Sequence, residues 1–278
     1  DFNLYVDNIE FICLPRIFTK GINFFISIIA LAHLITNKNY DIIISRNLYA
    51  AFLITYILRK KIIYETHLLE FGIKKFLQFK MINNKNVKLI TISNKLKKIL
   101  ESHHNTKIKS CNILHDAASV ISSNKIKPRG KVEVIKDYCN INKNEWEMIC
   151  GYFGHLYPGR GIDIIEEIAR MNKEKLFVIV GGNEDLIEQK RIENKDKNIY
   201  FAGYFKYVKS RMLMNACDVL LMPYQQKVSL GSNKYETSRW MSPMKMFEYL
   251  SSSVPIVSSD LEVLKEVLKN NKNKILVK

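Results

Sequence analysis

Cysteine is scarce in this chain of 278 residues, which contains five cysteines and no pair of them in a CxxC spacing. An odd number of cysteines without paired spacing excludes the disulfide framework of a small secreted domain. It also excludes the ligand spacing of the common structural zinc sites. We therefore expect reduced, mostly buried thiols, which are typical of a cytoplasmic protein.

Long hydrophobic runs are also missing. The longest apolar stretch, INFFISIIALAHLI at residues 22–35, contains Asn23 and His33. It is shorter than the roughly 20 residues that a membrane-spanning helix needs. It therefore predicts a buried or interfacial helix. The sequence has no short-period repeat and no low-complexity tract, which excludes a solenoid.

Acidic residues are outnumbered, with 27 Asp and Glu against 43 Lys and Arg and a formal net charge of +16. The lysines are scattered, and many stand beside Asn and Ile, as in NKNKILVK and INNKNVKLI. This pattern is typical of a compositional bias, and attraction to an anionic membrane or to a phosphorylated ligand stays open. A nucleic-acid-binding surface would need a clustered basic patch or an aromatic platform, and the sequence has neither.

The apolar residues, 47% of the chain, stand mostly in short β-branched runs that alternate with helical patterns. Continuous apolar strands linked by helices are typical of parallel sheets covered on both faces. The predicted strands are residues 40–46, 61–67, 88–93, 109–116, 147–154, 175–182, 198–204, 218–224 and 254–259. The sequence thus predicts an α/β protein with two doubly wound domains, residues 1–122 and 123–278.

A glycine-rich loop, Gly154 to Gly161, follows the strand that opens the second domain, and a helix is predicted to begin near Ile162. The spacing fits neither the dinucleotide fingerprint GxGxxG nor the P-loop GxxxxGK[ST]. Glycines let a backbone approach a ligand closely, and a helix N-terminus offers free N–H groups to an anion. Arg160 can fork onto phosphate oxygens, and the alternative is a solvated arginine at a turn.

The segment SPMKMFEYL raises a question about charge. Ser242 and Pro243 predict a helix start, because Ser is a good N-cap and Pro suits the first helical position. Lys245 would then lie in the first turn, where the helix dipole disfavours a cation. One interpretation is an exposed pair of Lys245 and Glu248. The sharper hypothesis is that Lys245 meets an anion there, while Glu248 accepts sugar or ribose hydroxyls.

Taken together, these segments resemble a family. GRGIDIIEEIA, NIYFAGYFKYVKSRMLMNACDVLLMPY and SPMKMFEYLSSSVPIVSSD are similar to the motifs of retaining glycosyltransferases of the GT-B fold, family 4 (the glycosyltransferase group 1 set). In the first half KIIYETH, LITISNKLKKIL and NILHDAASV are similar too. The resemblance implies two Rossmann-like domains that face a cleft, the first binding the acceptor and the second binding a nucleotide-sugar donor.

The resemblance also implies roles for single residues. Arg160 stands where the family has a basic residue on the donor diphosphate, and Glu248 stands at the second acid of the E-x7-E motif, which holds the ribose. His67 stands where a histidine contacts the transferred sugar. We expect three residues to be catalytic: Arg160, His67 and Lys245. The further donor-binding candidates are Gly154, His155, Gly161, Tyr204 at the base, Ser242 and Met244.

The chain departs from the family pattern in several places. Trp240 replaces the first acid of E-x7-E, for which Glu236 is a candidate substitute, and His155 stands where many members have a second basic residue. The family's N-terminal glycine-rich loop would precede Asp1, and its crossing C-terminal helix would follow Lys278. We therefore expect a chain that is truncated at both ends.

The function that the resemblance implies is transfer of a sugar, with retention, from a nucleotide diphosphate sugar to a glycan or a lipid-linked glycan. The resemblance implies no metal ion and no further cofactor. We expect a cytoplasmic enzyme at the inner membrane face, in peripheral contact with anionic membrane and without a nucleic-acid partner. The alternatives are a sugar-nucleotide 2-epimerase on the same fold, a non-catalytic sugar-nucleotide binder and a basic nucleic-acid-binding protein.

Overall fold

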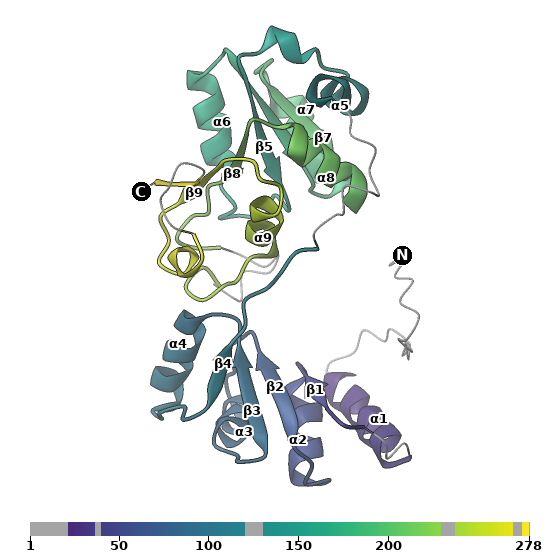
Figure 1. The fold of residues 1–278 in the computed structure, drawn as a ribbon, viewed down its shortest axis with the longest axis vertical. Coiled ribbons are helices and arrows are strands. Elements are labelled where there is room, and N and C mark those ends of the chain that lie inside the picture. The colour runs from purple at the N-terminus through teal and green to yellow at the C-terminus, as the bar shows by residue number, and fades with distance from the viewer. Residues whose placement is uncertain (1–21, 37–39, 120–129, 229–236, 269–273, 278) are drawn as a thin grey trace. The chain divides into compact units, whose positions relative to one another are not determined.

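The computed structural model describes residues 22–36, 40–119, 130–228, 237–268 and 274–277 (Figure 1). The chain divides into two compact units. The first consists of Asp1–Ile90 and Glu101–Asn112, and the second of Thr91–Leu100 and Ile113–Lys278. The predicted boundary between residues 122 and 123 lies outside the described residues.

The first unit is built on a four-stranded sheet in the order β1-β2-β3-β4 (Figure 1). The strands are β1 (Ile44–Ser45), β2 (Ile62–Thr66), β3 (Val87–Thr91) and β4 (Cys111–Ile113). The helices are α1 (Ile22–Thr36), α2 (Leu48–Tyr56) and α3 (Ile73–Ile82), and the division between the units falls within α4 (Asn94–His104). β1 and β2 pair in parallel, with Ile44 opposite Ile63. All four predicted strands of this half are confirmed, although each is shorter than predicted.

Helix α1 confirms the helix predicted for the apolar stretch, but it is not a buried helix in the described part of the chain. Ser27 is fully buried, whereas Phe25 is 61% exposed and Ile29 is 49% exposed. The helix packs on α2, and the Ser27 hydroxyl donates to Asn47, the residue that caps α2. Among the described residues no helix is long and apolar enough to cross a membrane.

The second unit contains a six-stranded sheet in the order β10-β9-β8-β5-β6-β7. The strands are β5 (Met148–Phe153), β6 (Lys175–Val180), β7 (Ile199–Gly203), β8 (Val219–Met222), β9 (Ile256–Ser259) and β10 (Lys274–Val277). The helices are α5 (Lys131–Cys139), α6 (Ile162–Met171), α7 (Glu184–Glu193), α8 (Tyr207–Ala216) and α9 (Met244–Leu250). Two short 3₁₀ turns, Lys143–Glu145 and Leu264–Glu266, complete the unit.

The strand pairings described in this second sheet are all parallel. Counted from β5, the strands follow the doubly wound order 3-2-1-4-5-6, so the direction of winding reverses between β5 and β8. The five strands predicted for this half are confirmed. β10 was not predicted, because the short apolar run ILV follows a polar segment and gains strand character only by pairing with β9.

Both faces of the second sheet are buried, which explains why its strands read as continuous apolar runs. On β5, Ile149 and Phe153 belong to one core cluster, while Cys150 and Tyr152 belong to the cluster on the other face. The thiols of Cys139, Cys150 and Cys217 are buried, and Cys111 is half-buried. The prediction of reduced, mostly buried cysteines is confirmed for these four, and Cys13 lies outside the described residues.

Candidate functional site

The candidate site lies where β5 and β8 end, on either side of the point at which the strand order reverses. In doubly wound sheets this is the crevice in which ligands bind, because the two loops leave for opposite faces of the sheet. β5 ends at Phe153 and passes into the glycine-rich loop, and β8 ends at Met222 and passes into Pro223 and Tyr224. The two loops meet, since the Gln225 N–H donates to the Gly159 carbonyl at 2.9 Å.

The glycines of the loop serve packing against protein backbone. Gly159 and Gly161 have φ values of 81° and 82°, in the left-handed region that favours glycine. A Cβ on Gly159 would lie 1.8 Å from the Lys227 carbonyl oxygen, and one on Gly161 would lie 1.9 Å from the Pro223 carbonyl oxygen. These two glycines therefore bring the loop onto the chain that follows β8. Helix α6 begins at Ile162, as predicted.

Gly154 has a different task, because it makes room for a side chain. A Cβ at this position would lie 2.7 Å from Cε of Lys245 and 3.0 Å from its Nζ. The backbone at Gly154 also has a φ of 145°, which side-chain-bearing residues rarely adopt. The structure thus brings Gly154 and Lys245, two of the predicted donor-site residues, next to each other. They meet because the Lys245 side chain packs against the backbone of Gly154.

Lys245 is buried, with 8% of its surface exposed, which excludes the exposed Lys–Glu pair. Its Nζ lies 3.5 Å from the centroid of the Tyr152 ring and makes no hydrogen bond to any described residue. Burial lowers the pKa of Lys245 well below its usual value, the charge of Arg160 lowers it further, and Glu248 opposes the shift. A buried amine without an acceptor is costly in a folded protein and marks a place where charge is expected from outside.

The helix that carries Lys245 starts later than predicted. α9 begins at Met244, and Pro243 occupies the N-cap position without a side-chain cap. The Ser242 hydroxyl accepts a hydrogen bond from the Asp116 N–H at 2.9 Å, so the prediction of Ser242 as N-cap was wrong. The reason is competition: a serine next to a proline can bond to any nearby N–H, and here the chain after β4 supplies one.

Arg160 joins Lys245 over the same aromatic ring. Its Nη1 donates to the Tyr224 hydroxyl at 2.9 Å, and its Cζ lies 5.1 Å from the centroid of the Tyr224 ring. Nζ of Lys245 is 5.4 Å from that centroid. Nε of Arg160 is buried and makes no hydrogen bond to a described residue. Arg160 is therefore held by protein on one side, which excludes a freely solvated arginine at a turn.

Glu248 lies on α9 one turn after Lys245 and is half-buried. Burial raises the pKa of Glu248, and the charges of Arg211 and Lys245 oppose this rise. Arg211 of α8 is buried; it donates to the Glu248 carbonyl oxygen and, at 2.6 Å, to the Ser251 hydroxyl. Arg211 therefore fixes the end of α9. The sequence analysis did not identify it, and the available signal was an arginine among Met and Leu residues on a helix.

Other predicted donor residues lie nearer the surface. His155 is exposed, and its ring stacks on Tyr157 at 4.9 Å between centroids. Burial, Arg160 and Lys245, in that order, lower the pKa of His155, which places it in the field of the two cations. Met244 is 60% exposed. Tyr204 is 77% exposed beyond the end of β7, and β6 separates β7 from β5, so the sheet does not bring it to the crevice.

The position of the missing acid is filled by apolar surface. Trp240 is 8% exposed, and its carbonyl oxygen accepts a hydrogen bond from the Ser93 hydroxyl at 2.8 Å. Glu236, the candidate substitute, lies outside the described residues. Among the residues that the structure describes, no three His, Cys, Asp or Glu side chains are grouped so that they could hold a metal ion.

The first unit has its own polar cluster, where β1 and β2 end. His67 follows β2, and its Nε2 lies 2.6 Å from Oε1 of Glu65. Nη2 of Arg46, which follows β1, lies 2.7 Å from the same oxygen. Burial alone would raise the pKa of Glu65, but hydrogen bonds from His67 and Arg46 lower it. Sequence analysis missed Arg46 and Glu65, although neighbouring parallel strands that end in polar residues were the signal for them.

A buried amide holds the segment around His67. Gln78 is fully buried; its Nε2 donates to the Thr66 hydroxyl at 3.1 Å and to the Leu68 carbonyl at 3.0 Å. Its Oε1 accepts from the Glu70 N–H at 3.2 Å and lies 3.0 Å from Nε2 of His104. Because Oε1 can only accept, Nε2 of His104 carries the proton. His67 thus lies between two residues whose positions Gln78 fixes.

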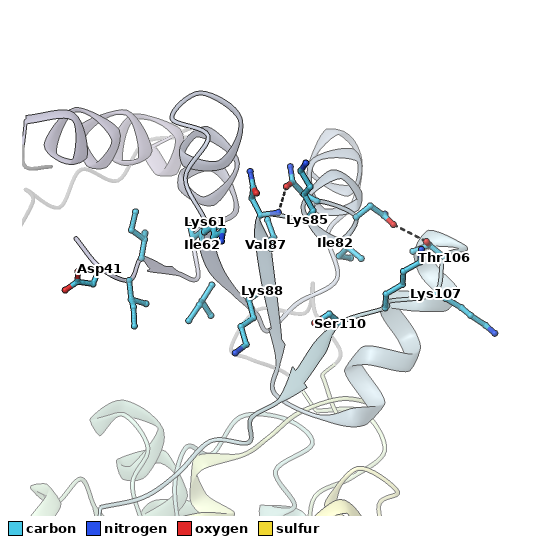
Figure 2. Close-up of a pocket in the computed structure, with 17 residues that line it drawn as sticks. Asp41, Lys61, Ile62, Ile82, Lys85, Val87, Lys88, Thr106, Lys107 and Ser110 are labelled. Atoms are coloured by element: carbon cyan, nitrogen blue, oxygen red, sulfur yellow. Dashed lines mark hydrogen bonds between the residues drawn. The ribbon is translucent and has the colours of Figure 1, made fainter. Parts of the chain in front are cut away.

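A hollow in the first unit is not a candidate for the same chemistry. It has a volume of about 920 Å³ and lies where the strands of the first sheet begin (Figure 2), whereas His67 follows the end of β2. Its charged lining residues are Asp41, Lys61, Lys85, Lys88, Lys107 and Lys109. A second hollow of about 860 Å³ lies in the second unit and reaches Tyr224 and Pro223, so it borders the crevice described above.

Residues 147–278 match the protein-family model described as glycosyl transferases group 1. None of the curated proteins has a sequence that matches the chain. Similar solved structures include HepE of Anabaena in complex with UDP and glucose, with 16% identity, a TM-score of 0.61, and coverage of 95% of this chain and 70% of that one. A glycosyltransferase from Rickettsia africae has 14% identity, a TM-score of 0.67, and coverage of 96% and 70%.

The catalytic domain of starch synthase IV from Arabidopsis thaliana, bound to ADP and acarbose, has 12% identity, a TM-score of 0.58, and coverage of 92% and 65%. At such identities the solved structures establish the fold, and they confirm the predicted α/β architecture of the GT-B class. Residues 147–278 match the group 1 glycosyl transferase model, and this match supports the prediction of a glycosyltransferase.

Proposed function

We propose that this glycosyltransferase takes a nucleotide diphosphate sugar as donor and binds its diphosphate at Arg160 and Lys245. The observation that carries the proposal is the buried ammonium of Lys245, which has no acceptor among the described residues and lies beside a second cation. A diphosphate supplies the missing acceptors and compensates both charges. The similar structures that were solved in complex with UDP, UDP-glucose or ADP support a nucleotide-sugar donor.

Each polar residue of the crevice has a part in this proposal. Arg160 and Lys245 stabilise the negative charge that develops on the departing diphosphate, which is electrostatic catalysis by preorganised donors. Glu248 accepts hydrogen bonds from the ribose hydroxyls, at a place that Arg211 fixes through the Glu248 carbonyl. The nucleotide sugar is a co-substrate, and the proposal needs no further cofactor.

The reaction that we propose proceeds with retention, in the manner of family 4. The bond between the anomeric carbon and the diphosphate oxygen breaks, and a bond from the acceptor hydroxyl oxygen forms on the same face. The hydroxyl proton passes to the departing phosphate, so no strong protein base is needed. His67, held by Glu65, contacts the transferred sugar.

The acceptor in this proposal is a glycan or a lipid-linked glycan, bound by the first unit. The net charge of +16 supports an acceptor presented at an anionic surface, such as the inner face of a membrane. The exposed lysines that line the hollow in Figure 2 add to that charge.

Thermal stabilisation of the protein by UDP, GDP, ADP and CMP tests the proposal. Wild type is compared with Lys245→Ala, Glu248→Ala and a control, Lys197→Ala, which removes an exposed lysine of the same unit. We expect one diphosphate to raise the Tm of wild type and of the control, and to raise it less in both site variants. If no nucleotide stabilises the folded wild-type protein, the proposal is wrong. Sugar product that forms without any acceptor would indicate a 2-epimerase.

A further inference from the structure

The two cations of the crevice are partnered by aromatic rings and not by carboxylates. Buried cations in proteins are usually paired with Asp or Glu, because an unpaired charge is costly away from water. In the described part of the chain neither Arg160 nor Lys245 forms an ion pair with a carboxylate. Their nearest described partners are Tyr152 and Tyr224.

The ring of Tyr152 packs against the amino group of Lys245. Tyr152 is the fifth residue of β5, is 1% exposed, and points its ring face at Nζ of Lys245 from 3.5 Å. Its hydroxyl donates to the His155 carbonyl oxygen at 2.6 Å, so the ring is fixed both by the strand and by the loop that follows. β5 and the loop that follows it therefore fix the position of the Tyr152 ring, and the ring in turn positions the amino group of Lys245.

Tyr224 contacts both cations. It follows β8, is 2% exposed, and its hydroxyl accepts from Nη1 of Arg160 at 2.9 Å. The ring centroid is 5.1 Å from Cζ of Arg160 and 5.4 Å from Nζ of Lys245, within the range of a cation–π interaction. One side chain at the end of β8 thus fixes the distance between two groups that come from different loops.

The chemical difference between a phenol and a carboxylate explains why tyrosines stand here. A carboxylate would neutralise the cations and compete with an incoming phosphate for the same N–H groups. A ring face stabilises a cation through its quadrupole and leaves the net charge unchanged. Burial raises the pKa of both Tyr152 and Tyr224, so neither phenol ionises at neutral pH to take over the role of a carboxylate.

We propose that Tyr152 and Tyr224 are positioning residues of the donor site, which hold Arg160 and Lys245 together without neutralising them and so reserve both charges for a diphosphate. This inference rests on the proposed function. It assigns the two rings to the diphosphate of the donor and not to its base, its ribose or its sugar. Gly154 completes the arrangement, because any Cβ there would displace the Lys245 stem.

The test uses variants that separate ring from hydroxyl. Tyr152→Phe keeps the ring under Lys245, Tyr152→Leu removes it, and Tyr224→Phe removes the acceptor of Arg160. The matched control is Tyr138→Leu, which removes a ring 4.7 Å from the Lys209 ammonium, a contact outside the crevice. Calorimetry of the whole chain gives Kd for inorganic pyrophosphate and for the nucleoside of the best-binding diphosphate, and urea unfolding without ligand reports stability.

We expect Tyr152→Leu to weaken pyrophosphate binding about 30-fold, as for a desolvated cation–π contact, and Tyr152→Phe to stay within about threefold of wild type. Tyr224→Phe should weaken it about tenfold, because a hydrogen bond to a charged group is lost. The affinity for the nucleoside should stay the same in all of these variants. The control Tyr138→Leu should bind both pyrophosphate and the nucleoside as tightly as wild type does. A merely structural role would instead lower the stability and weaken nucleoside and pyrophosphate alike.

Two results would overturn the inference, and they differ in what else they affect. If wild type binds pyrophosphate and a nucleoside diphosphate, but Tyr152→Leu and Tyr224→Phe bind pyrophosphate equally well, the positioning role is wrong and the proposed function stands. If folded wild type binds neither pyrophosphate nor any nucleoside diphosphate, the proposed function fails and the inference fails with it.

Discussion

The two units partner their clustered basic side chains in opposite ways. At the end of β2, a carboxylate stands between two basic groups: Glu65 lies within 2.7 Å of Arg46 and within 2.6 Å of His67. At the ends of β5 and β8, Arg160 and Lys245 lie over tyrosine rings. The first cluster is electrically satisfied within the protein, and the second is not. An unsatisfied cluster gains most from an anion, so the difference supports the proposal that the second unit binds the phosphates.

A second contrast concerns the lysines themselves. The hollow at the beginning of the first sheet is lined by five lysines, all exposed (Figure 2). An exposed lysine is solvated, so it has little effect on the free energy of the folded state. It is therefore weak evidence for a specific ligand. Lys245 is one lysine, but it is buried and lacks an acceptor. The net charge of the chain is therefore a weaker guide to its function than the position of this single residue.

The largest effect is expected from Lys245→Met, which removes the charge and keeps the length of the side chain. We expect the affinity for a nucleoside diphosphate to fall by about 100-fold or more, because a charge-assisted contact is lost. The free energy of unfolding at pH 7 should stay equal or rise, since a buried ammonium without a partner no longer has to be accommodated. Calorimetry and urea unfolding measure the two quantities.

The pH dependence of stability sharpens this prediction. The folded-state pKa of Lys245 is lowered, so between that pKa and about 10.5 the unfolded state binds more protons than the folded one. The contribution of Lys245 to the free energy of unfolding therefore rises with pH across this window. The slope should be smaller in Lys245→Met. An unchanged slope, together with a large loss of stability, would show that Lys245 is an ordinary structural lysine.

A smaller effect is expected from Glu248→Gln. The affinity for a nucleoside diphosphate should fall about tenfold, because an ionised acceptor for the ribose is lost, while the affinity for pyrophosphate should not fall. Burial raises the pKa of Glu248, so its carboxylate destabilises the folded state increasingly as pH rises from about 4.5 through the folded-state pKa. Glutamine should remove this loss. Equal weakening of both ligands would contradict the ribose assignment.

The smallest effect is expected from Glu65→Gln in the first unit. Its lowered pKa means that the carboxylate stabilises the fold above the unfolded-state value of about 4.5, and that this stabilisation is lost as pH falls through the folded-state pKa. At pH 7 the loss should be below about 1 kcal/mol, because Arg46 is largely exposed. Wild type and variant should become equally stable in acid. Any change in the affinity for the diphosphate would contradict the assignment of the phosphates to the second unit.

The architecture was predictable because it depends on patterns that extend over many residues. Runs such as KLFVIV and EMICGYFG are apolar on both faces, and only a covered parallel sheet explains nine of them separated by helices. β10 was missed because its strand character comes from the partner strand β9 and not from its own short sequence. Ser242 was misassigned because its hydrogen-bond partner, Asp116, is distant in the sequence.

For the candidate site, the sequence predicted three residues that the structure brings near one another, but not the contacts that hold them. Arg160, Lys245 and Glu248 follow from the loop and the SPMKMFEYL segment, and the structure brings them into one electrostatic neighbourhood. Tyr152, Tyr224 and Arg211 were not identified, because tyrosines on buried strands and an arginine on an apolar helix look like core and surface residues in sequence. Their significance depends on contacts between elements that a single sequence does not display.

The most direct test of the central claim is the number of protons taken up when the diphosphate binds. Calorimetry in two buffers of different ionisation enthalpy, at about pH 8, gives this number for wild type and for Lys245→Met. We expect wild type to take up more protons than Lys245→Met, because burial lowers the pKa of Lys245 and the ligand stabilises its charged form. The same number of protons in both proteins would contradict the claim that burial lowers the pKa of Lys245 and that the diphosphate raises it again.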